Sequence, residues 1–114
     1  MVNFEVWDIV KVPFPYTDRP VRQRRPALVV AADEIEAVHG LIWLVMITSA
    51  ENRGWPDDVR LSDLRTAGLP APSIVRPAKI ATVDARDVQR LGILRIADCE
   101  AVASRLCAPW RLVR

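Results

Sequence analysis

Arginine and hydroxyl side chains beside predicted strands are the residues of this sequence best suited to chemistry. Arg25 precedes Pro26 at the start of one apolar run, and Thr48 and Ser49 directly follow another. A guanidinium is planar and matches phosphate oxygens in pairs, and a hydroxyl adds a further donor. Together these residues predict a phosphate-binding cleft. Taken singly, an arginine at a strand start is usually a solvated charge, and a Thr-Ser pair usually forms a turn.

A basic segment, residues 19–25, adjoins this cleft. It contains no acidic residue and holds Arg19, Arg22, Arg24 and Arg25. All but two of the 16 Lys and Arg residues are Arg, although the net charge of the 114-residue chain is only +2. Genomic base composition explains the overall excess of arginine over lysine as well as a binding function does, but it explains the cluster at residues 19–25 less well. The cluster needs a counter-anion.

The residue inventory disfavours other kinds of site. The one histidine, His39, lies in an acidic connection, and there is no CxxC pair, so we expect no metal site. Glycine-rich phosphate loops and the GxSxG elbow are also absent. Neighbouring Asp57 and Asp58 would point to opposite faces of a strand, which favours solvated carboxylates. We expect no cofactor.

Hydrophobic patterning predicts a mainly β domain. Short runs rich in β-formers predict strands over residues 7–12, 27–31, 41–47, 58–61, 73–76 and 79–83. Residues 13–24 contain three prolines and predict a long loop, and residues 66–72 break the strand pattern. Pro77 separates the last two predicted strands.

Helical features are short except at the end of the chain. Residues 33–40 predict a surface turn or one helical turn ended by Gly40. Asp84 can cap a brief helix that ends at Gly92. A closing amphipathic helix is predicted by the spacing of Ile96, Cys99, Val102, Ala103, Leu106 and Trp110.

These elements favour a single α+β, mainly β domain over residues 1–114. Strands do not alternate regularly with long helices, so a parallel sheet is disfavoured. We expect a strongly curved antiparallel sheet or barrel of five to six strands, with the closing helix packed on it. The longest apolar run, residues 41–47, is too short to span a membrane, and no signal peptide is evident, so we expect a cytoplasmic protein.

The predicted topology brings the reactive side chains together. If the strands at 27–31 and 41–47 pair antiparallel in a meander, the start of one lies beside the end of the other. Arg25 then lies near Thr48 and Ser49.

An ordered set of motifs resembles the MazF/PemK family, toxins of bacterial toxin–antitoxin pairs. The motifs are residues 7–10 (WDIV), 12–18 (VPFPYTD), 25–30 (RPALVV), 47–49 (ITS), 68–69 (GL), 73–76 (SIVR), 79–80 (KI), Thr82 and 91–94 (LGIL). The resemblance implies an SH3-like barrel, a homodimer and a metal-independent endoribonuclease that cuts single-stranded RNA. It further implies attack by the ribose 2′-hydroxyl, which leaves a 2′,3′-cyclic phosphate and a 5′-hydroxyl.

The resemblance also assigns roles. The residues that match the catalytic positions are Arg25, Thr48, Ser49 and Arg76. Arg25 is suited to stabilising the charge of a phosphorane, and Thr48 to donating to a non-bridging oxygen or orienting the 2′-hydroxyl. Arg76 is suited to clamping the phosphate or to protonating the leaving 5′-oxygen. Beside them, RNA contacts are expected from Tyr16, Arg19, Arg22, Arg24, Arg53, Trp55 and Lys79. Trp55 could equally pack beneath a loop or at a dimer interface.

Departures from the family pattern leave the general base unassigned. Some members carry an aspartate where this chain has Ala78, and some carry a histidine in the first loop, where residues 17–24 have none. Slow or lost activity is therefore an open alternative.

Two other functions compete. The CcdB toxin of the same fold poisons gyrase through a C-terminal Trp-Gly-Ile tail, whereas this sequence ends Trp110-Arg111-Leu112-Val113-Arg114. The other alternative is an inert barrel that binds nucleic acid or a regulatory protein. The resemblance also implies an antitoxin whose acidic disordered tail covers the cleft.

Overall fold

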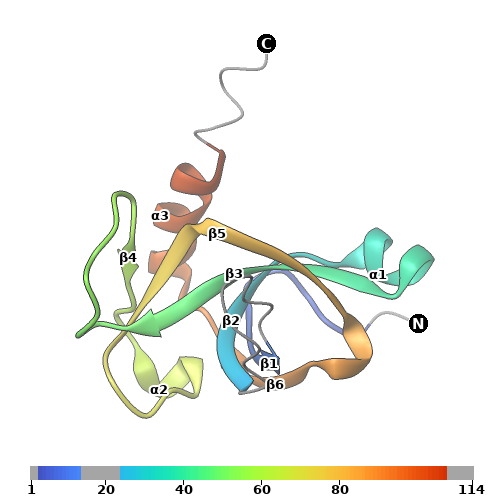
Figure 1. The fold of residues 1–114 in the computed structure, drawn as a ribbon, viewed down its shortest axis with the longest axis horizontal. Helices are drawn as coiled ribbons and strands as arrows, with labels where there is room; N and C mark the ends of the chain where they lie inside the picture. Colours follow the sequence, from blue (N-terminus) through green and yellow to red (C-terminus); the bar gives the residue numbers. More distant parts are fainter. Residues whose placement is uncertain (1–2, 14–23, 108–114) are drawn as a thin grey trace.

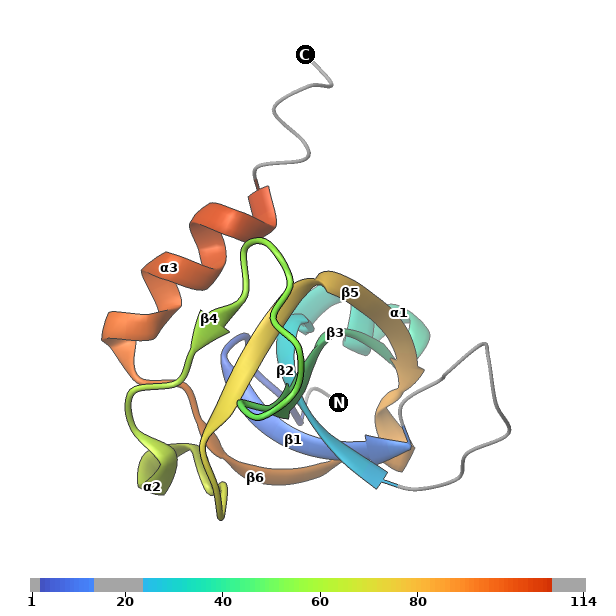
Figure 2. The same ribbon diagram turned by 60° about the vertical axis from the view of Figure 1, so that its left-hand side comes forward.

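A curled antiparallel sheet forms the body of the protein. The computed structural model describes residues 3–13 and 24–107. Within them the strand order is β4-β5-β3-β2-β1-β6, and the sheet closes partly into a barrel (Figures 1 and 2). The strands are β1 (Asp8–Pro13), β2 (Arg24–Ala31), β3 (Leu41–Ser49), β4 (Val59–Arg60), β5 (Ser73–Asp84) and β6 (Gln89–Ile93). The predicted curved antiparallel sheet is confirmed.

Short helices surround the sheet: α1 (Asp33–His39), α2 (Leu64–Ala67), α3 (Ile96–Cys107) and the 3-10 turn η1 (Ala85–Asp87). Figure 2 shows α3 on the outside of the barrel, where it packs against β4 and β5. The closing amphipathic helix is confirmed, although Ile96 is exposed and Trp110 lies outside the described residues. No helix in the described part of the chain is long and apolar enough to cross a membrane.

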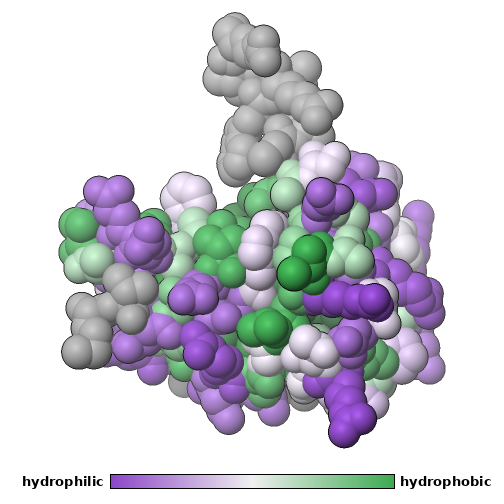
Figure 3. Space-filling view, turned by 180° about the vertical axis from the view of Figure 1, so that it is seen from behind, coloured by the Kyte–Doolittle hydropathy of each residue, from purple (hydrophilic) through white to green (hydrophobic). Residues whose placement is uncertain are grey.

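The central strands are buried on both faces. One core contains Val10, Val12, Val29, Ile42, Leu44 and Met46. The other joins the opposite face to α2 and α3 and contains Ile9, Leu28, Val45, Ile47, Ala67 and Val102. Because successive side chains of a strand point to opposite faces, burial on both faces requires the continuous apolar runs seen at 27–31 and 41–47. Elsewhere, Figure 3 shows surface hydrophobic side chains in patches among hydrophilic ones.

The predicted helix after Asp84 is wrong beyond its first turn. Asp84 does cap η1, since its carboxylate accepts a hydrogen bond from the Arg86 N–H at 2.9 Å. The chain then forms β6, which pairs with β1. The open edge of β1 offers backbone groups that need partners, and this tertiary pairing outweighs the local helical pattern.

The two strands predicted around Pro77 are one strand, β5. Arg76 pairs with Met46 and Ile80 with Val45, so residues 77–79 bulge out of the ladder. Pro77 lacks the N–H that continued pairing would require. The position of the interruption was predicted, but the continuity of the strand across it was not.

Other element bounds also shift. The strand predicted at 58–61 is reduced to Val59–Arg60, and β2 begins at Arg24. The helix α2 was not predicted; its cap, Asp63, accepts hydrogen bonds from the Thr66 N–H and hydroxyl at 3.0 and 2.7 Å. Gly40 ends α1 as predicted, in a left-handed conformation.

Two glycines of similar conformation should differ in their tolerance of alanine. Gly68 has φ +74°, and an added Cβ would lie 2.3 Å from the Leu91 carbonyl oxygen, whereas Gly40 has φ +69° and nothing within 4 Å. We expect Gly40→Ala to cost about 1 kcal/mol of unfolding free energy and Gly68→Ala about 2–4 kcal/mol, because only the latter adds a backbone clash. Urea unfolding measures both, and equal losses would contradict the packing of α2 on β6.

Candidate active site

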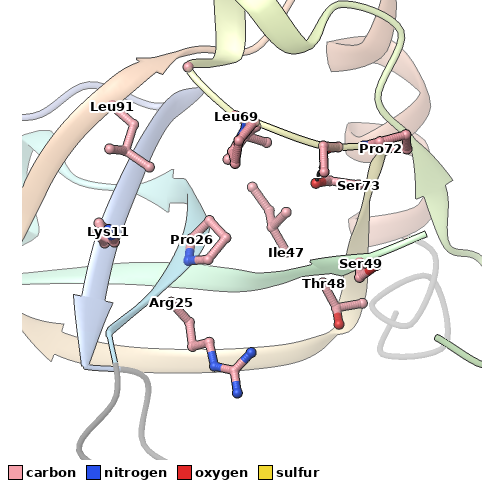
Figure 4. Close-up of a pocket in the computed structure, with 13 residues that line it drawn as sticks. Lys11, Arg25, Pro26, Ile47, Thr48, Ser49, Leu69, Pro72, Ser73 and Leu91 are labelled. Atoms are coloured by element: carbon pink, nitrogen blue, oxygen red, sulfur yellow. Dashed lines mark hydrogen bonds between the residues drawn. The ribbon is translucent and has the colours of Figure 1, made fainter. Parts of the chain in front are cut away.

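Arg25 and Thr48 lie opposite each other on neighbouring strands. β2 and β3 pair antiparallel, with Ala27 opposite Met46. Two further residues in this register bring Arg25 opposite Thr48, and opposed residues share a face of the sheet. Figure 4 shows both side chains pointing to the same side of their strands, away from Leu69. The predicted antiparallel pairing is confirmed, and it brings Arg25 and Thr48 to the same end and the same face of the sheet.

Both residues line a cavity of ≈ 280 Å³ at this end of the sheet. Its wall is mainly apolar, and its polar members include Lys11, Ser49 and Ser73. Small-ligand binding sites are usually pockets of this kind, lined mainly by apolar side chains with a few polar groups. Ser49 also lines this cavity, but as the next residue along the strand it points to the opposite face from Thr48.

A residue that the sequence analysis missed contacts Thr48. The Asn52 side-chain amide donates a hydrogen bond of 2.6 Å to the Thr48 hydroxyl oxygen. Thr48 is 9% exposed, whereas Asn52 lies on the surface. No spacing rule reveals this contact, because it depends on the fold of the turn after β3.

Arg76 is held by other protein groups. Its Nε and Nη2 atoms each donate a 3.1 Å hydrogen bond to the Asp58 carboxylate, and Nη2 also donates to the Arg53 carbonyl at 2.9 Å. Its guanidinium carbon lies 4.3 Å from the centroid of the Trp55 ring. Arg76 is only 7% exposed. It therefore ties the connection between β3 and β4 to β5.

The carboxylate of Asp58 is a buried partner of this arginine. Burial by itself would raise the pKa of Asp58, but hydrogen bonds from Arg76 and from the Trp55 N–H, together with the Arg76 charge, lower it below its ordinary value. The interpretation of Asp58 as a solvated carboxylate is wrong, since its side chain is 11% exposed.

The other candidate residues lie around this end of the sheet or outside the described chain. Arg24 donates to the Lys11 and Asp87 carbonyls at 3.2 and 2.9 Å. Trp55 is 43% exposed, with the Lys79 amine 5.9 Å from its ring centroid, and Arg53 lies on the surface. Tyr16, Arg19 and Arg22 lie outside the described residues.

His39, which the sequence places in an acidic connection, lies away from Arg25 and Thr48. His39 ends α1, just before β3 begins, whereas Thr48 lies at the far end of that strand. Within residues 3–13 and 24–107, no group of three or more His, Cys, Asp or Glu side chains could hold a metal ion.

Comparison with known proteins now assigns the family. The sequence profile described as "PemK-like, MazF-like toxin of type II toxin-antitoxin system" matches residues 5–108. The chain belongs to this family. No curated protein matches the sequence closely enough to count as a relative.

Solved structures share the fold of this PemK-like, MazF-like chain. MazF (Form-I) from Deinococcus radiodurans has a TM-score of 0.76 at 23% identity, over 97% of this chain and 98% of that chain. MazE-MazF (Form-II) from the same organism has a TM-score of 0.72 at 23% identity, over 96% of each chain. An endoribonuclease in complex with its cognate antitoxin from Mycobacterial species has a TM-score of 0.71 at 18% identity, over 94% of each chain.

The Asp58–Arg76 pair predicts an acid-sensitive contribution to stability. The pKa of Asp58 is below its unfolded value of 3.8 in the folded protein, so the contribution is present above pH 3.8 and is lost as pH falls through the folded pKa. We expect Asp58→Asn to flatten the acid limb of the stability profile and to cost roughly 3 kcal/mol at neutral pH, because it leaves Arg76 poorly paired.

Denaturant unfolding across pH measures this effect, with Asp57→Asn as the control. Asp57 is exposed and adjoins Asp58. Equal profiles for the two variants would contradict the assigned pair.

Proposed function

We propose that the protein is a metal-independent endoribonuclease toxin that cuts single-stranded RNA. The ribose 2′-hydroxyl attacks the adjacent phosphorus and leaves a 2′,3′-cyclic phosphate and a 5′-hydroxyl. The observation that supports this most is the β2–β3 register, which sets Arg25 opposite Thr48 beside a cavity. Membership of a toxin family makes cellular RNA in the cytoplasm the expected substrate.

Arg25 and Thr48 supply the donors that such a reaction needs. Attack by the 2′-hydroxyl produces a doubly charged phosphorane, and fixed donors aimed at its oxygens stabilise it most where water is excluded. Arg25 faces the phosphorane charge, and the Thr48 hydroxyl donates to a non-bridging oxygen. Burial of Thr48 limits competition from water for this bond.

Proton transfer is the weaker part of this site. An arginine remains protonated in proteins and does not serve as a base. The position where some family members carry an aspartate is Ala78, which lies exposed in the bulge of β5. We propose that catalysis relies mainly on charge stabilisation and is correspondingly slow.

The family resemblance suggests that Arg76 clamps the phosphate. We propose instead that Arg76 has a structural role. Its bonds to Asp58 and Arg53 hold the Trp55 loop against β5. The exposed part of the Trp55 ring then offers a stacking surface for an RNA base. The Lys79 amine beside that ring adds attraction for the neighbouring phosphates.

We also propose a homodimer and an antitoxin partner with an acidic tail. Among the similar structures described above are MazE-MazF from Deinococcus radiodurans and an endoribonuclease in complex with its cognate antitoxin from Mycobacterial species. The basic residues that attract RNA attract an acidic segment equally, and the exposed Trp55 can anchor an apolar side chain of that segment. RNA and antitoxin therefore compete for one surface.

Substitution of the two facing residues should remove the activity. We expect Arg25→Ala to abolish cleavage and Thr48→Ala to slow it by about 10²–10³-fold, as for other oxyanion donors. His39→Ala, at the opposite end of β3, is the control and should cut at the wild-type rate. Single-turnover assays in EDTA measure the rates, and full activity of a stable Arg25→Ala protein would refute the site.

The product ends in the same assay separate the competing functions. New 5′-hydroxyl ends support the ribonuclease. Arrest of gyrase without RNA cleavage would instead support the gyrase poison, and neither activity would support an inert binding barrel.

Competition between RNA and antitoxin gives a further test. We propose that both ligands use the surface formed by the basic residues and Trp55. A peptide from the acidic tail encoded by the neighbouring reading frame should therefore displace a fluorescent, non-cleavable RNA. A scrambled peptide of equal charge is the control for simple electrostatics. An unchanged RNA affinity at saturating peptide would show that the two ligands bind separate surfaces.

A further inference from the structure

The hydrogen bond between Asn52 and Thr48 has a defined direction. The Asn52 amide nitrogen donates to the Thr48 hydroxyl oxygen at 2.6 Å, so that oxygen acts as the acceptor. A threonine hydroxyl has one proton and can accept while it donates elsewhere. The proton of Thr48 is therefore directed away from Asn52.

The turn after β3 fixes Asn52 in this position. The Asn52 N–H donates to the Ser49 carbonyl at 3.1 Å, and the Glu51 N–H donates to the Ser49 hydroxyl at 3.2 Å. The Ala50 N–H donates to the Pro72 carbonyl at 3.0 Å and ties the turn to the segment before β5. Ser49 thus contributes through its position in the turn, although it points away from the face of Thr48.

We propose that Asn52 is a positioning residue that orients the Thr48 hydroxyl to donate to a phosphate oxygen of the RNA. This inference rests on the proposed ribonuclease function and adds a residue to its site. Without the amide, the hydroxyl is free to rotate and to donate to other acceptors near the end of β3. With the amide, the Thr48 oxygen is occupied and its proton is available to the substrate before the RNA binds, which is how preorganised donors lower a barrier.

A carboxylate at position 52 is the sharpest perturbation. Asn52→Asp has the same shape but can only accept, so it should draw the Thr48 proton toward itself and away from the RNA. We expect Asn52→Asp to slow single-turnover cleavage about 10²-fold, close to the loss of a whole donor. Asn52→Ala removes the amide but leaves the hydroxyl free, and should lower kcat by roughly 3–10-fold with KM unchanged.

A double-mutant cycle with Thr48→Ala separates this role from a general effect of charge. Once the hydroxyl is gone, Asn52→Asp and Asn52→Ala should each change the rate by less than about twofold. Urea unfolding of each variant checks that stability is retained, which is expected because Asn52 lies on the surface.

The outcomes distinguish the inference from the function on which it rests. Equal slowing by Asn52→Asp in the wild-type and Thr48→Ala backgrounds would overturn the inference, because the carboxylate would then act by charge alone. A wild-type rate for Asn52→Ala would overturn it as well. Failure of the wild-type protein to cut RNA in the same assay would overturn the proposed function and this inference together.

Discussion

The pairing of β2 with β3 is the constraint on which the candidate site depends. Ala27 pairs with Met46 in this ladder. Side chains of β2 and β3 are buried in one core on one face of the sheet and in a second core on the other face. A slip of one residue would turn a strand's side chains to the opposite face, so the two cores fix the register. Because Arg25 and Thr48 lie two residues beyond that pair, the packing of apolar side chains also sets the position of the polar ones.

Two arginines near the same end of the sheet have different surroundings, and their chemistry differs accordingly. Two nitrogens of Arg76 donate to the Asp58 carboxylate, and its guanidinium packs on the Trp55 ring. The charge of Arg76 is therefore balanced within the protein. A bidentate pair of this kind is geometrically demanding and holds a loop in one conformation. Arg25 instead lines the cavity at the start of β2. In the proposed function, Arg76 therefore shapes the loop that carries Trp55, and Arg25 binds the phosphate.

Much of this architecture follows from local sequence pattern. The apolar runs at 27–31 and 41–47 predict central strands because burial on both faces leaves no alternation, and adjacent strands in a chain usually pair. The meeting of Arg25 and Thr48 follows from that pairing alone. What could not be predicted depends on distant partners: β6 forms because β1 has an open edge, and Asp58 is buried because Arg76 reaches it from β5. Asn52 was missed for a different reason: its contact with Thr48, only four residues away, depends on the conformation of the turn after β3.

The proposed roles of the two arginines are tested most directly by comparing their side chains when RNA binds. The NMR signals of the Arg25 and Arg76 Nε–H groups can be followed during titration with an RNA that carries 2′-deoxyribose at the cleavage position and cannot be cut. We expect a large shift for Arg25 and a smaller one for Arg76, whose Nε already donates to Asp58. A shift of Arg76 with no change at Arg25 would contradict the proposed roles.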